Sequence, residues 1–301
     1  MRWNNQISTI NFLARATRKV TKNTRLTNKI YWWKEKKAYD FLADYDKKSD
    51  IQEEINKKEV EVNSIIWTGW LQGEENAPEI VKFCLKNLRK HSGTHKVICI
   101  TEDNLNEYLP ELSPVIIDKY KKGEIIPAHF MDIIRIKLLR IYGGLWVDAT
   151  VLITQDLKDY IFQKTFYSYR GIPGPFHTNP ANYKWCTFFF SARRESKFMV
   201  SVDDILNEYW QKNNYAIDYF LLDYAMSYVY LKDGNVKHDV DAIELQDLDI
   251  GSLMPLLRAP DSKENMILTQ QMLEKSWIFK LTYKDFNENE KIIFDKLLNN
   301  G

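Results

Sequence analysis

The stretch that most constrains the fold of this chain is PAHFMDIIRIKLLRIYGGLWVDATVLI, residues 127–153. From Pro127 onward, apolar side chains occupy most sides of a helical projection, which predicts a buried helix. Pro127 suits the first helical turn, because proline lacks an N–H group that would be unpaired there anyway. Gly143 and Gly144 predict the end of this helix, since glycine adopts the left-handed conformation of a C-cap without steric cost.

The residues after the two glycines predict a buried strand that contains a single charge. Leu145–Ile153 is short, apolar and partly β-branched, as expected of a central strand. Asp148 is its only charged residue. Burying an unpaired carboxylate is costly, so we expect Asp148 to have a cation, several N–H donors or a metal as its partner.

Strands and helices alternate in the region before this stretch. Val62–Leu71 and Lys96–Thr101 predict buried strands, and Pro78 opens an amphipathic helix between them. This alternation predicts an α/β fold with a mostly parallel sheet, flanked by helices and joined by right-handed crossovers. Ligands gather beyond the carboxyl ends of such strands, where the indole of Trp67 could stack on a nucleobase. The alternative is that Trp67 belongs to the core.

The second half of the chain predicts further helices and a long loop. Tyr215–Leu231 is almost entirely apolar apart from Asp218 and Asp223, which predicts a buried helix. Glycines and prolines cluster in Gly171–Tyr183, which predicts a loop. The other expected elements are strands at Phe166–Arg170 and Trp185–Ser191, a helix at Val200–Lys212, a solvated acidic loop at His238–Asp249, a loop at Gly251–Pro260 and a charged helix at Asn287–Gly301.

Residues 1–61 differ from the rest and predict a basic, helical arm outside the core. Ten basic residues stand against one acid, Glu35, in the first 37 positions, and aromatic residues are interspersed among them. Such a segment could pack as a solvated arm, or residues 1–37 could contact an anionic membrane surface peripherally. Contact with nucleic acid is the third alternative.

Several function classes are excluded by what the sequence lacks. Its three cysteines are too few and too scattered for a disulfide framework or a zinc site, and they fit a reducing compartment. The N-terminal residues lack the uninterrupted apolar run of a signal peptide, and no apolar run is long enough to cross a bilayer. We therefore expect a cytoplasmic protein that could lie peripherally at the inner face of the membrane. The motifs of dehydrogenases, P-loop NTPases, zinc proteases and serine hydrolases are absent.

Two quoted segments resemble a known family. YGGLWVDATVL with HFMDIIRIKLL before it, and WLQGEENAPEIVKFCLKNLRKH nearer the N-terminus, resemble the capsular polysaccharide synthesis proteins, a branch of glycosyltransferase family 32. More distantly, they are similar to the glucosyltransferase domain of the large clostridial toxins. The resemblance implies a GT-A-like domain at residues 62–301. It also implies a hexosyltransferase-like enzyme that moves a sugar from a nucleotide-sugar, a UDP-sugar, to a glycan or lipid-linked glycan acceptor with retention of configuration.

The resemblance also implies a metal site with one altered ligand. In that superfamily the strand ends in Asp-x-Asp, whose second acid binds a divalent metal and whose first contacts ribose and sugar. Here Asp148 keeps the first position as the expected catalytic acid, but Thr150 replaces the second. A hydroxyl is a weaker ligand for a hard cation than a carboxylate. The resemblance therefore implies Mn²⁺ or Mg²⁺ at Asp148 and Thr150, with the weaker ligand at the second position.

Further residues are expected to bind the nucleotide-sugar donor, because they match positions in the motifs of the family. Asp132 and Arg135 lie three residues apart on the predicted helix, where they could simply neutralise each other. The resemblance favours Asp132 on sugar or ribose hydroxyls and Arg135 on phosphate, for which an arginine fork is suited. It also places Trp67 against uracil. Lys280, in SWIFKLTYK, resembles the family's closing segment and could reach the diphosphate or the metal.

Two isolated acids in the predicted helix Tyr215–Leu231 require an explanation. Relatives have an aspartate-containing helix at this stage of the chain, whose first acid meets the transferred sugar or acceptor. This implies a catalytic role for Asp218 and acceptor binding for Asp223, with capping or an ion pair as the alternative. Two other functions stay open: a non-catalytic nucleotide-sugar-binding subunit, and a basic scaffold that binds membrane or nucleic acid.

Overall fold

The computed structural model describes residues 23–46, 65–175, 177, 179–259 and 262–284, together with seven residues between Thr9 and Lys19. The helix predicted at Asn287–Gly301, and most of the first 22 residues, lie outside this part of the chain. Within the described ranges, every helix is too short or too polar to span a lipid bilayer.

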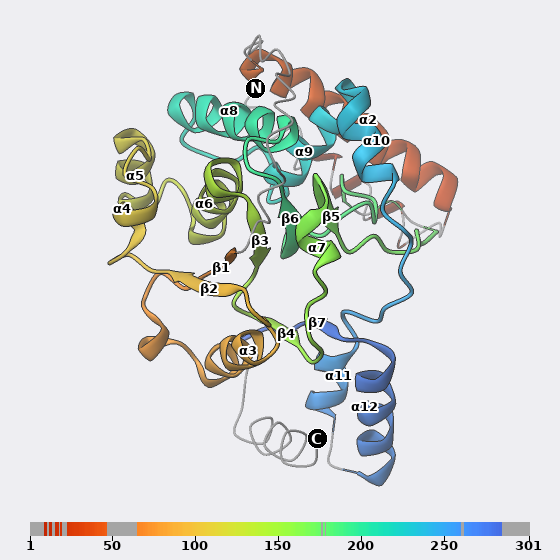
Figure 1. Ribbon diagram of the computed structural model, residues 1–301. Helices are drawn as coiled ribbons and strands as arrows, with labels where there is room; N and C mark the ends of the chain where they lie inside the picture. The colour runs from red at the N-terminus through yellow and green to blue at the C-terminus, as the bar shows by residue number, and fades with distance from the viewer. Residues whose placement is uncertain are drawn as a thin grey trace.

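A five-stranded sheet with the strand order β2-β1-β3-β6-β5 forms the centre of the molecule (Figure 1). β1 (Ile65–Gly69) pairs in parallel with both β2 (Lys96–Ile100) and β3 (Gly144–Val147). β6 (Phe189–Ala192) runs antiparallel to β3 and to β5 (Phe166–Ser168). Four of these five strands therefore point the same way, and the predicted mostly parallel sheet is confirmed.

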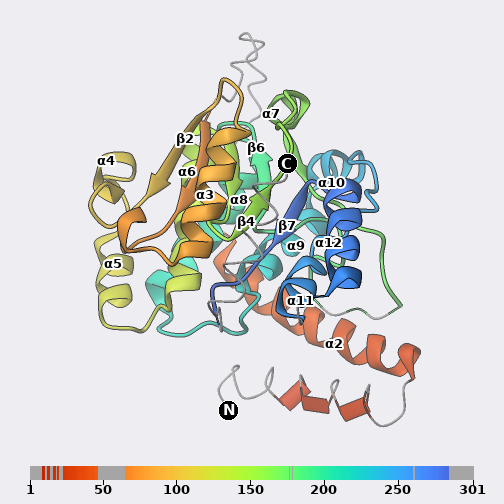
Figure 2. The ribbon, with the colours of Figure 1, turned by 90° about the horizontal axis from the view of Figure 1, so that it is seen from below.

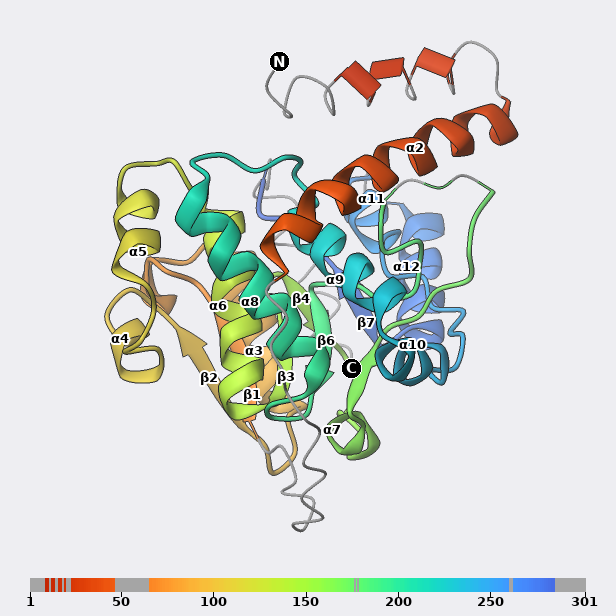
Figure 3. The ribbon, with the colours of Figure 1, turned by 90° about the horizontal axis from the view of Figure 1, so that it is seen from above.

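Helices cover both faces of this sheet. The face seen from above carries α6 (Pro127–Tyr142), α8 (Lys197–Lys212), α9 (Leu221–Lys232) and α2 (Thr24–Leu42) (Figure 3). The opposite face carries α3 (Glu79–Lys90), with α11 (Leu253–Arg258) and α12 (Lys263–Lys275) beside it (Figure 2). The shorter helices are α4 (Leu105–Tyr108), α5 (Pro114–Lys121), α7 (Tyr160–Gln163) and α10 (Gly234–Asp241), with 3₁₀ turns at Ala43–Tyr45 and Glu74–Asn76.

The predicted strand Leu145–Ile153 is in fact two strands in two sheets. After β3 the chain turns through Asp148–Thr150, and β4 (Val151–Ile153) pairs antiparallel with β7 (Ile278–Lys280). The N–H of Val151 donates to the carbonyl of Asp148 at 2.8 Å, which closes the turn. The single-strand prediction was wrong because both halves are equally apolar. Aspartate at the first position of a turn is the local signal for the break.

Gly143 and Gly144 end α6 as predicted and place β3 beside β1. Gly143 has φ 68° and its N–H donates to the carbonyl of Leu139. Gly144 has φ 104°, and a Cβ atom there would lie 2.3 Å from the backbone oxygen of Ile65. Only glycine allows this close approach between the two strands.

The described part of the N-terminal arm packs into the main core. α2 lies across α9 (Figure 3), and Ala38 and Leu42 on α2 are fully buried in the same hydrophobic cluster as the central sheet. That residues 1–61 form a unit of their own stays a prediction.

Four other predicted elements differ from the structure. The helix expected at Tyr215–Leu231 begins only at Leu221, so Asp218 lies in the preceding loop, where it accepts the N–H of Phe220 at 3.0 Å. The strand expected at Trp185–Ser191 is confined to β6. The two expected loops after residue 237 contain the end of α10 and all of α11. Asp233 is the N-cap of α10, and its side chain accepts hydrogen bonds from two backbone N–H groups. This N-cap residue was the sequence signal for the start of α10, but the acidic composition of the segment led to the prediction of a loop.

Candidate functional site

The order of the strands places a candidate site between the ends of β1 and β3. From β1 the chain crosses to β2 on one side, and it later returns to β3 on the other side. At such a switch point the loops diverge and leave a crevice outside the carboxyl ends of the strands, where ligands bind. Trp70 follows β1 there, and Asp148 follows β3.

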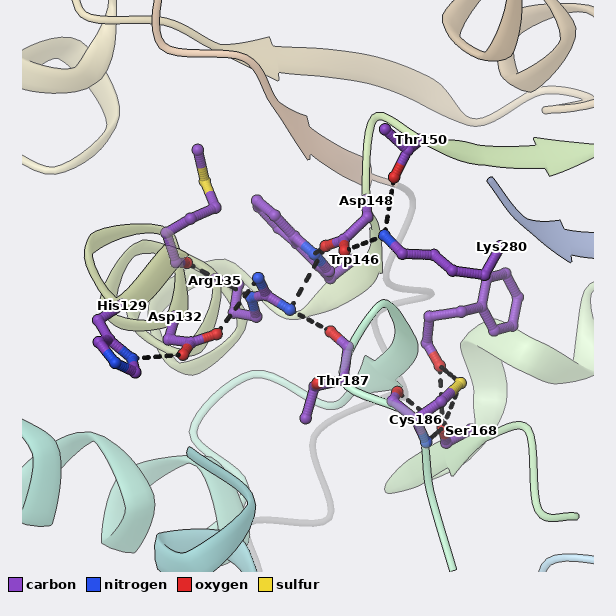
Figure 4. A network of polar contacts seen from close by, with 12 residues as sticks. His129, Asp132, Arg135, Trp146, Asp148, Thr150, Ser168, Cys186, Thr187 and Lys280 are labelled. Carbon is purple, nitrogen blue, oxygen red and sulfur yellow. Dashed lines mark hydrogen bonds and ion pairs between the residues drawn. The ribbon is translucent and has the colours of Figure 1, made fainter. Parts of the chain in front are cut away.

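The carboxylate of Asp148 is held by three side chains (Figure 4). The ammonium of Lys280 lies 2.7 Å from Oδ2. The indole N–H of Trp146 donates to Oδ1 at 2.8 Å, and the guanidinium of Arg135 lies 3.4 Å from the same oxygen. Of the expected partners of Asp148, which were a cation, several N–H donors or a metal, the structure confirms the cation.

These cations keep Asp148 ionised. Burial by itself raises the pKa of this carboxyl group, but the charges of Lys280 and then Arg135 outweigh it and lower the pKa to about 2. The site therefore contains a carboxylate that stays negative at neutral pH.

Lys280 reaches Asp148 because β7 pairs with β4. In this pairing Lys280 lies opposite Val151, next to the turn that contains Thr150. Its ammonium donates to the Thr150 hydroxyl at 2.7 Å as well as to Asp148, and it lies 5.4 Å from the ring centre of Phe188. The pairing of β4 with β7 thus places the ammonium of Lys280 at the end of β3. No sequence pattern close to Asp148 could predict this contact.

Arg135 binds protein groups on several elements. Its side chain is 8% exposed and lies 3.3 Å from Oδ1 of Asp132. It donates to the carbonyl of Thr187, in the loop before β6, and more weakly to that of Met131. The guanidinium also lies 5.1 Å from the ring centre of Trp146. These contacts support a role for Arg135 in positioning Asp148. They give less support to the predicted role, in which its guanidinium binds phosphate.

Asp132 and Arg135 lie together as their spacing on α6 predicted. Oδ2 of Asp132 is also 3.5 Å from Nδ1 of His129. His129 is buried against the rings of Trp210 and Tyr219. Asp132 keeps 17% of its side chain exposed.

Asp223 and Tyr219 bring α9 and its preceding loop to the same place. Burial, together with the negative charge of Asp132, raises the pKa of Asp223 to about 7, although the N–H of Trp185 donates to its Oδ1 at 3.0 Å. Partial burial and the charges of Asp132 and Asp148 raise the pKa of Tyr219, which is 66% exposed. Sequence analysis missed Tyr219, because an exposed tyrosine in a loop has no distinguishing pattern.

Asp218 is paired away from this network. Its carboxylate lies 3.2 Å from the ammonium of Lys34 on α2, and both side chains are almost fully buried. The ion-pair alternative accounts for Asp218, and the contacts that hold it give no support to its predicted catalytic role.

Trp67 does not offer a surface for a nucleobase. It is 0% exposed, its indole N–H donates to the carbonyl of Gly143 at 2.9 Å, and its ring packs on Tyr108 and Tyr142. The predicted base platform is therefore corrected to a core residue. Glycine at position 144 lets the main chain approach closely enough for this bond.

A different aromatic pair lies at the carboxyl end of β1. Trp70 and Tyr283 meet edge to face, with ring centres 5.2 Å apart, and Tyr283 is 43% exposed. The buried indole N–H of Trp70 has no hydrogen-bond partner among the described residues. The charge of Tyr283 also contributes to the raised pKa of Tyr219.

The described residues do not fit a divalent metal between Asp148 and Thr150. A metal such as Mg²⁺ binds oxygen at about 2.0–2.1 Å, and the ammonium of Lys280 occupies the space between these two oxygens. No group of three or more His, Cys, Asp or Glu side chains suited to a metal occurs in the described part of the chain. The Mn²⁺ or Mg²⁺ expected from sequence stays a prediction.

Comparison with known proteins identifies the family. The chain is 26% identical over 102 residues to the O-glycosyltransferase PaGT of Phomopsis amygdali, a match that covers 31% of this chain and about a quarter of that relative. A solved structure, the PaToxG glycosyltransferase, covers 81% of this chain with 96% of its own length, at a TM-score of 0.41 and 11% identity. Residues 15–298 match the family described as capsular polysaccharide synthesis protein. The chain therefore belongs to the capsular polysaccharide synthesis protein family.

Proposed function

We propose that this protein is a glycosyltransferase that moves a sugar from a nucleotide-sugar donor, a UDP-sugar, to a surface or capsular polysaccharide. Family membership and the partial similarity to an O-glycosyltransferase support this proposal. The observation on which it rests most is the ionised Asp148 at the switch point of the sheet, with Lys280 on one of its oxygens. A polar site of this kind suits the hydroxyls and diphosphate of an activated sugar.

The reaction requires a cation beside the departing diphosphate. When the bond from the sugar to the diphosphate breaks, negative charge develops on the leaving oxygens, and a fixed positive group stabilises it. Lys280 is the cation of the network with the larger exposed surface, 33% of its side chain against 8% for Arg135. We assign Lys280 to the diphosphate and Arg135 to the positioning of Asp148.

The remaining site residues divide between donor and acceptor. We assign Asp148 and Asp132 to the hydroxyls of the ribose and the transferred sugar. Asp223, with a pKa of about 7, is assigned to an acceptor hydroxyl, to which a carboxyl group can donate or accept a hydrogen bond. Retention of anomeric configuration is part of the proposal by resemblance to the wider superfamily.

Donor hydrolysis tests this function directly. Purified protein is incubated with a panel of UDP- and GDP-sugars, and release of the nucleoside diphosphate is measured with EDTA or with MnCl₂. We expect release from one or more UDP-sugars, and loss of it in Asp148→Ala while circular dichroism shows an intact fold. Unchanged release in folded Asp148→Ala would refute the assigned site.

A non-catalytic subunit that binds nucleotide-sugar is the second candidate. The observation that favours it is that three protein side chains already hold the carboxylate of Asp148, together with a hydroxyl at Thr150 in place of a second acid. This candidate predicts a thermal shift with a UDP-sugar, because a ligand that binds the folded state stabilises it. It also predicts no hydrolysis or transfer with any acceptor.

A further inference from the structure

The ammonium of Lys280 occupies the position between the side chains of Asp148 and Thr150. Its Nζ atom lies 2.7 Å from Oδ2 of Asp148 and 2.7 Å from Oγ1 of Thr150. These are the two side chains that the turn Asp148–Thr150 can offer to a cation. The protein therefore supplies its own cation at this point, from β7, which is distant in sequence and adjacent in space.

The carboxylate of Asp148 has too few unused lone pairs to bind a metal ion well. Each carboxylate oxygen has about two lone pairs. Those of Oδ1 are directed to the indole N–H of Trp146 and the guanidinium of Arg135, and one of those of Oδ2 to Lys280. One lone pair remains, and any metal that used it would stand against the ammonium.

The ammonium of Lys280, in contrast, has one N–H donor that neither Asp148 nor Thr150 uses. An ammonium group has three N–H donors, and the two bonds to Asp148 and Thr150 use two of them. One third of its side chain is exposed, so a ligand can reach the group. Its two oxygen partners fix the ammonium in place before any ligand arrives.

The hydroxyl at position 150 is matched to this lysine. Thr150 holds Lys280 without adding a negative charge, and it is itself buried. An aspartate at the same position would put a second carboxylate on the ammonium and weaken its attraction for an anion. A threonine in place of an aspartate at position 150 thus favours the binding of an anion to the remaining N–H of Lys280.

We propose that Lys280 acts in place of a divalent metal, so that its ammonium binds the diphosphate of the nucleotide and nucleotide binding needs no metal ion. This inference rests on the proposed function, because that function supplies the diphosphate. As the sugar–oxygen bond breaks, the bonding electrons pass to the diphosphate oxygen. Lys280 stabilises the resulting charge through its third N–H and keeps its proton.

The first experiment measures UDP binding by isothermal titration calorimetry. The wild-type protein should bind UDP equally well with EDTA and with MnCl₂. Lys280→Met removes the charge and should weaken binding in EDTA by roughly ten- to a hundredfold, the size of a lost hydrogen bond to a charged group. Lys280→Arg keeps the charge and should lose less. Lys197→Met is the matched control, since Lys197 pairs with Asp233 at 2.7 Å with similar exposure, and it should leave binding unchanged.

The second experiment restores a metal site. The double variant Thr150→Asp, Lys280→Met offers two carboxylates and no ammonium, so it should bind UDP only with Mn²⁺. Electron paramagnetic resonance should show Mn²⁺ bound by this variant and not by the wild-type protein. Thr150→Asp alone should bind UDP more weakly than wild type in EDTA, because its new carboxylate neutralises Lys280.

The outcomes separate this inference from the proposed function. If wild-type protein binds UDP only with Mn²⁺, or if Lys280→Met binds as tightly as wild type in EDTA, the inference is wrong and the transferase proposal stands. If wild-type protein binds no nucleoside diphosphate and hydrolyses no nucleotide-sugar under either condition, the proposed function fails and the inference fails with it.

Discussion

Lys34 on α2 and Asp218 in the loop before α9 form a buried ion pair. The ammonium lies 3.2 Å from the carboxylate, and the two side chains are 4% and 6% exposed. The rings of Tyr31 and Tyr224 lie 5.6 Å and 5.3 Å from the same ammonium. The N-terminal arm is thus joined to the loop that carries Tyr219 to the site.

We expect the single variant Lys34→Met to be much less stable than wild type. Removal of one partner leaves the other charge buried, which costs about 3–5 kcal/mol in comparable pairs. Urea denaturation measures this loss. The double variant Lys34→Met, Asp218→Asn has no buried charge at this place and should recover part of the stability.

A control and an opposite result define this test. Lys29→Met changes an exposed lysine on the same helix and should alter stability little. If Asp218→Asn left stability unchanged but abolished donor hydrolysis, Asp218 would be catalytic after all and the structural role would be wrong.

The sequence predicted the parts of the fold that local patterns determine. The helix from Pro127, its end at Gly143, the strand β2 and the helix that became α3 were all foreseen from periodicity and from glycine or proline. The break at Asp148 was missed because apolar residues continue on both sides of it.

The site was predicted only as far as neighbouring residues show it. Asp132 and Arg135 share one helix, so their contact follows from spacing. Lys280 was named from resemblance, and its contact with Asp148 depends on the pairing of β7 with β4, which no local pattern predicts. Trp67 was misassigned because a tryptophan at a strand end looks the same in sequence whether its ring points into the core or into a crevice.

Gly144→Ala should disrupt the junction between α6 and β3. The added Cβ atom would lie 2.3 Å from the backbone oxygen of Ile65, and φ is 104°. Because backbone cannot move aside cheaply, we expect a loss well above the ~1–2 kcal/mol that a left-handed backbone alone costs an ordinary residue. Thermal denaturation should show it. Gly123→Ala is the matched control, since Gly123 has φ 74° but open space around it. Equal losses in the two variants would contradict the steric argument.

Asp148→Asn should lower stability at neutral pH and lose this effect in acid. The lowered pKa of Asp148, about 2 against an ordinary 3.8, means that ionisation favours the folded state. Its contribution, on the order of 2 kcal/mol, is present above about pH 4 and is lost as the pH falls toward 2. Urea denaturation at pH 7 and pH 3 should show the difference between wild type and variant shrinking. Asp118→Asn, in an exposed pair with Lys122, is the control. A difference that stayed constant with pH would contradict the assignment.

The exposed side of α2 is suited to the predicted membrane contact. Trp32 and Trp33 are 68% and 50% exposed, and Lys29 and Lys36 are exposed beside them. Each basic residue near an anionic surface contributes about 1 kcal/mol, and tryptophan suits the interface. We expect the protein to sediment with phosphatidylserine vesicles and not with phosphatidylcholine vesicles. Trp32→Ser with Trp33→Ser should reduce this binding, whereas Leu245→Ser, an exposed apolar residue elsewhere, should not. Equal sedimentation with both vesicle types would count against charge-driven contact.

Asp223→Asn should stabilise the protein at alkaline pH and leave it unchanged in acid. Burial raises the pKa of Asp223 to about 7, so the folded state holds this proton more tightly than the unfolded state, whose ordinary pKa is 3.8. The cost of ionising Asp223 therefore appears as the pH rises from about 4 and is complete above about 7. Asparagine carries no charge at any pH, and its side-chain oxygen can still accept the N–H of Trp185.

Urea denaturation of both proteins at pH 5 and pH 8 provides the measurement. We expect the variant to gain roughly 1–4 kcal/mol relative to wild type between the two pH values. Glu244→Gln, an exposed carboxyl group, should show no such gain. A variant equally affected at both pH values would mean that Asp223 does not titrate between pH 5 and pH 8. That result would contradict the pKa of about 7 on which its assignment to an acceptor hydroxyl rests.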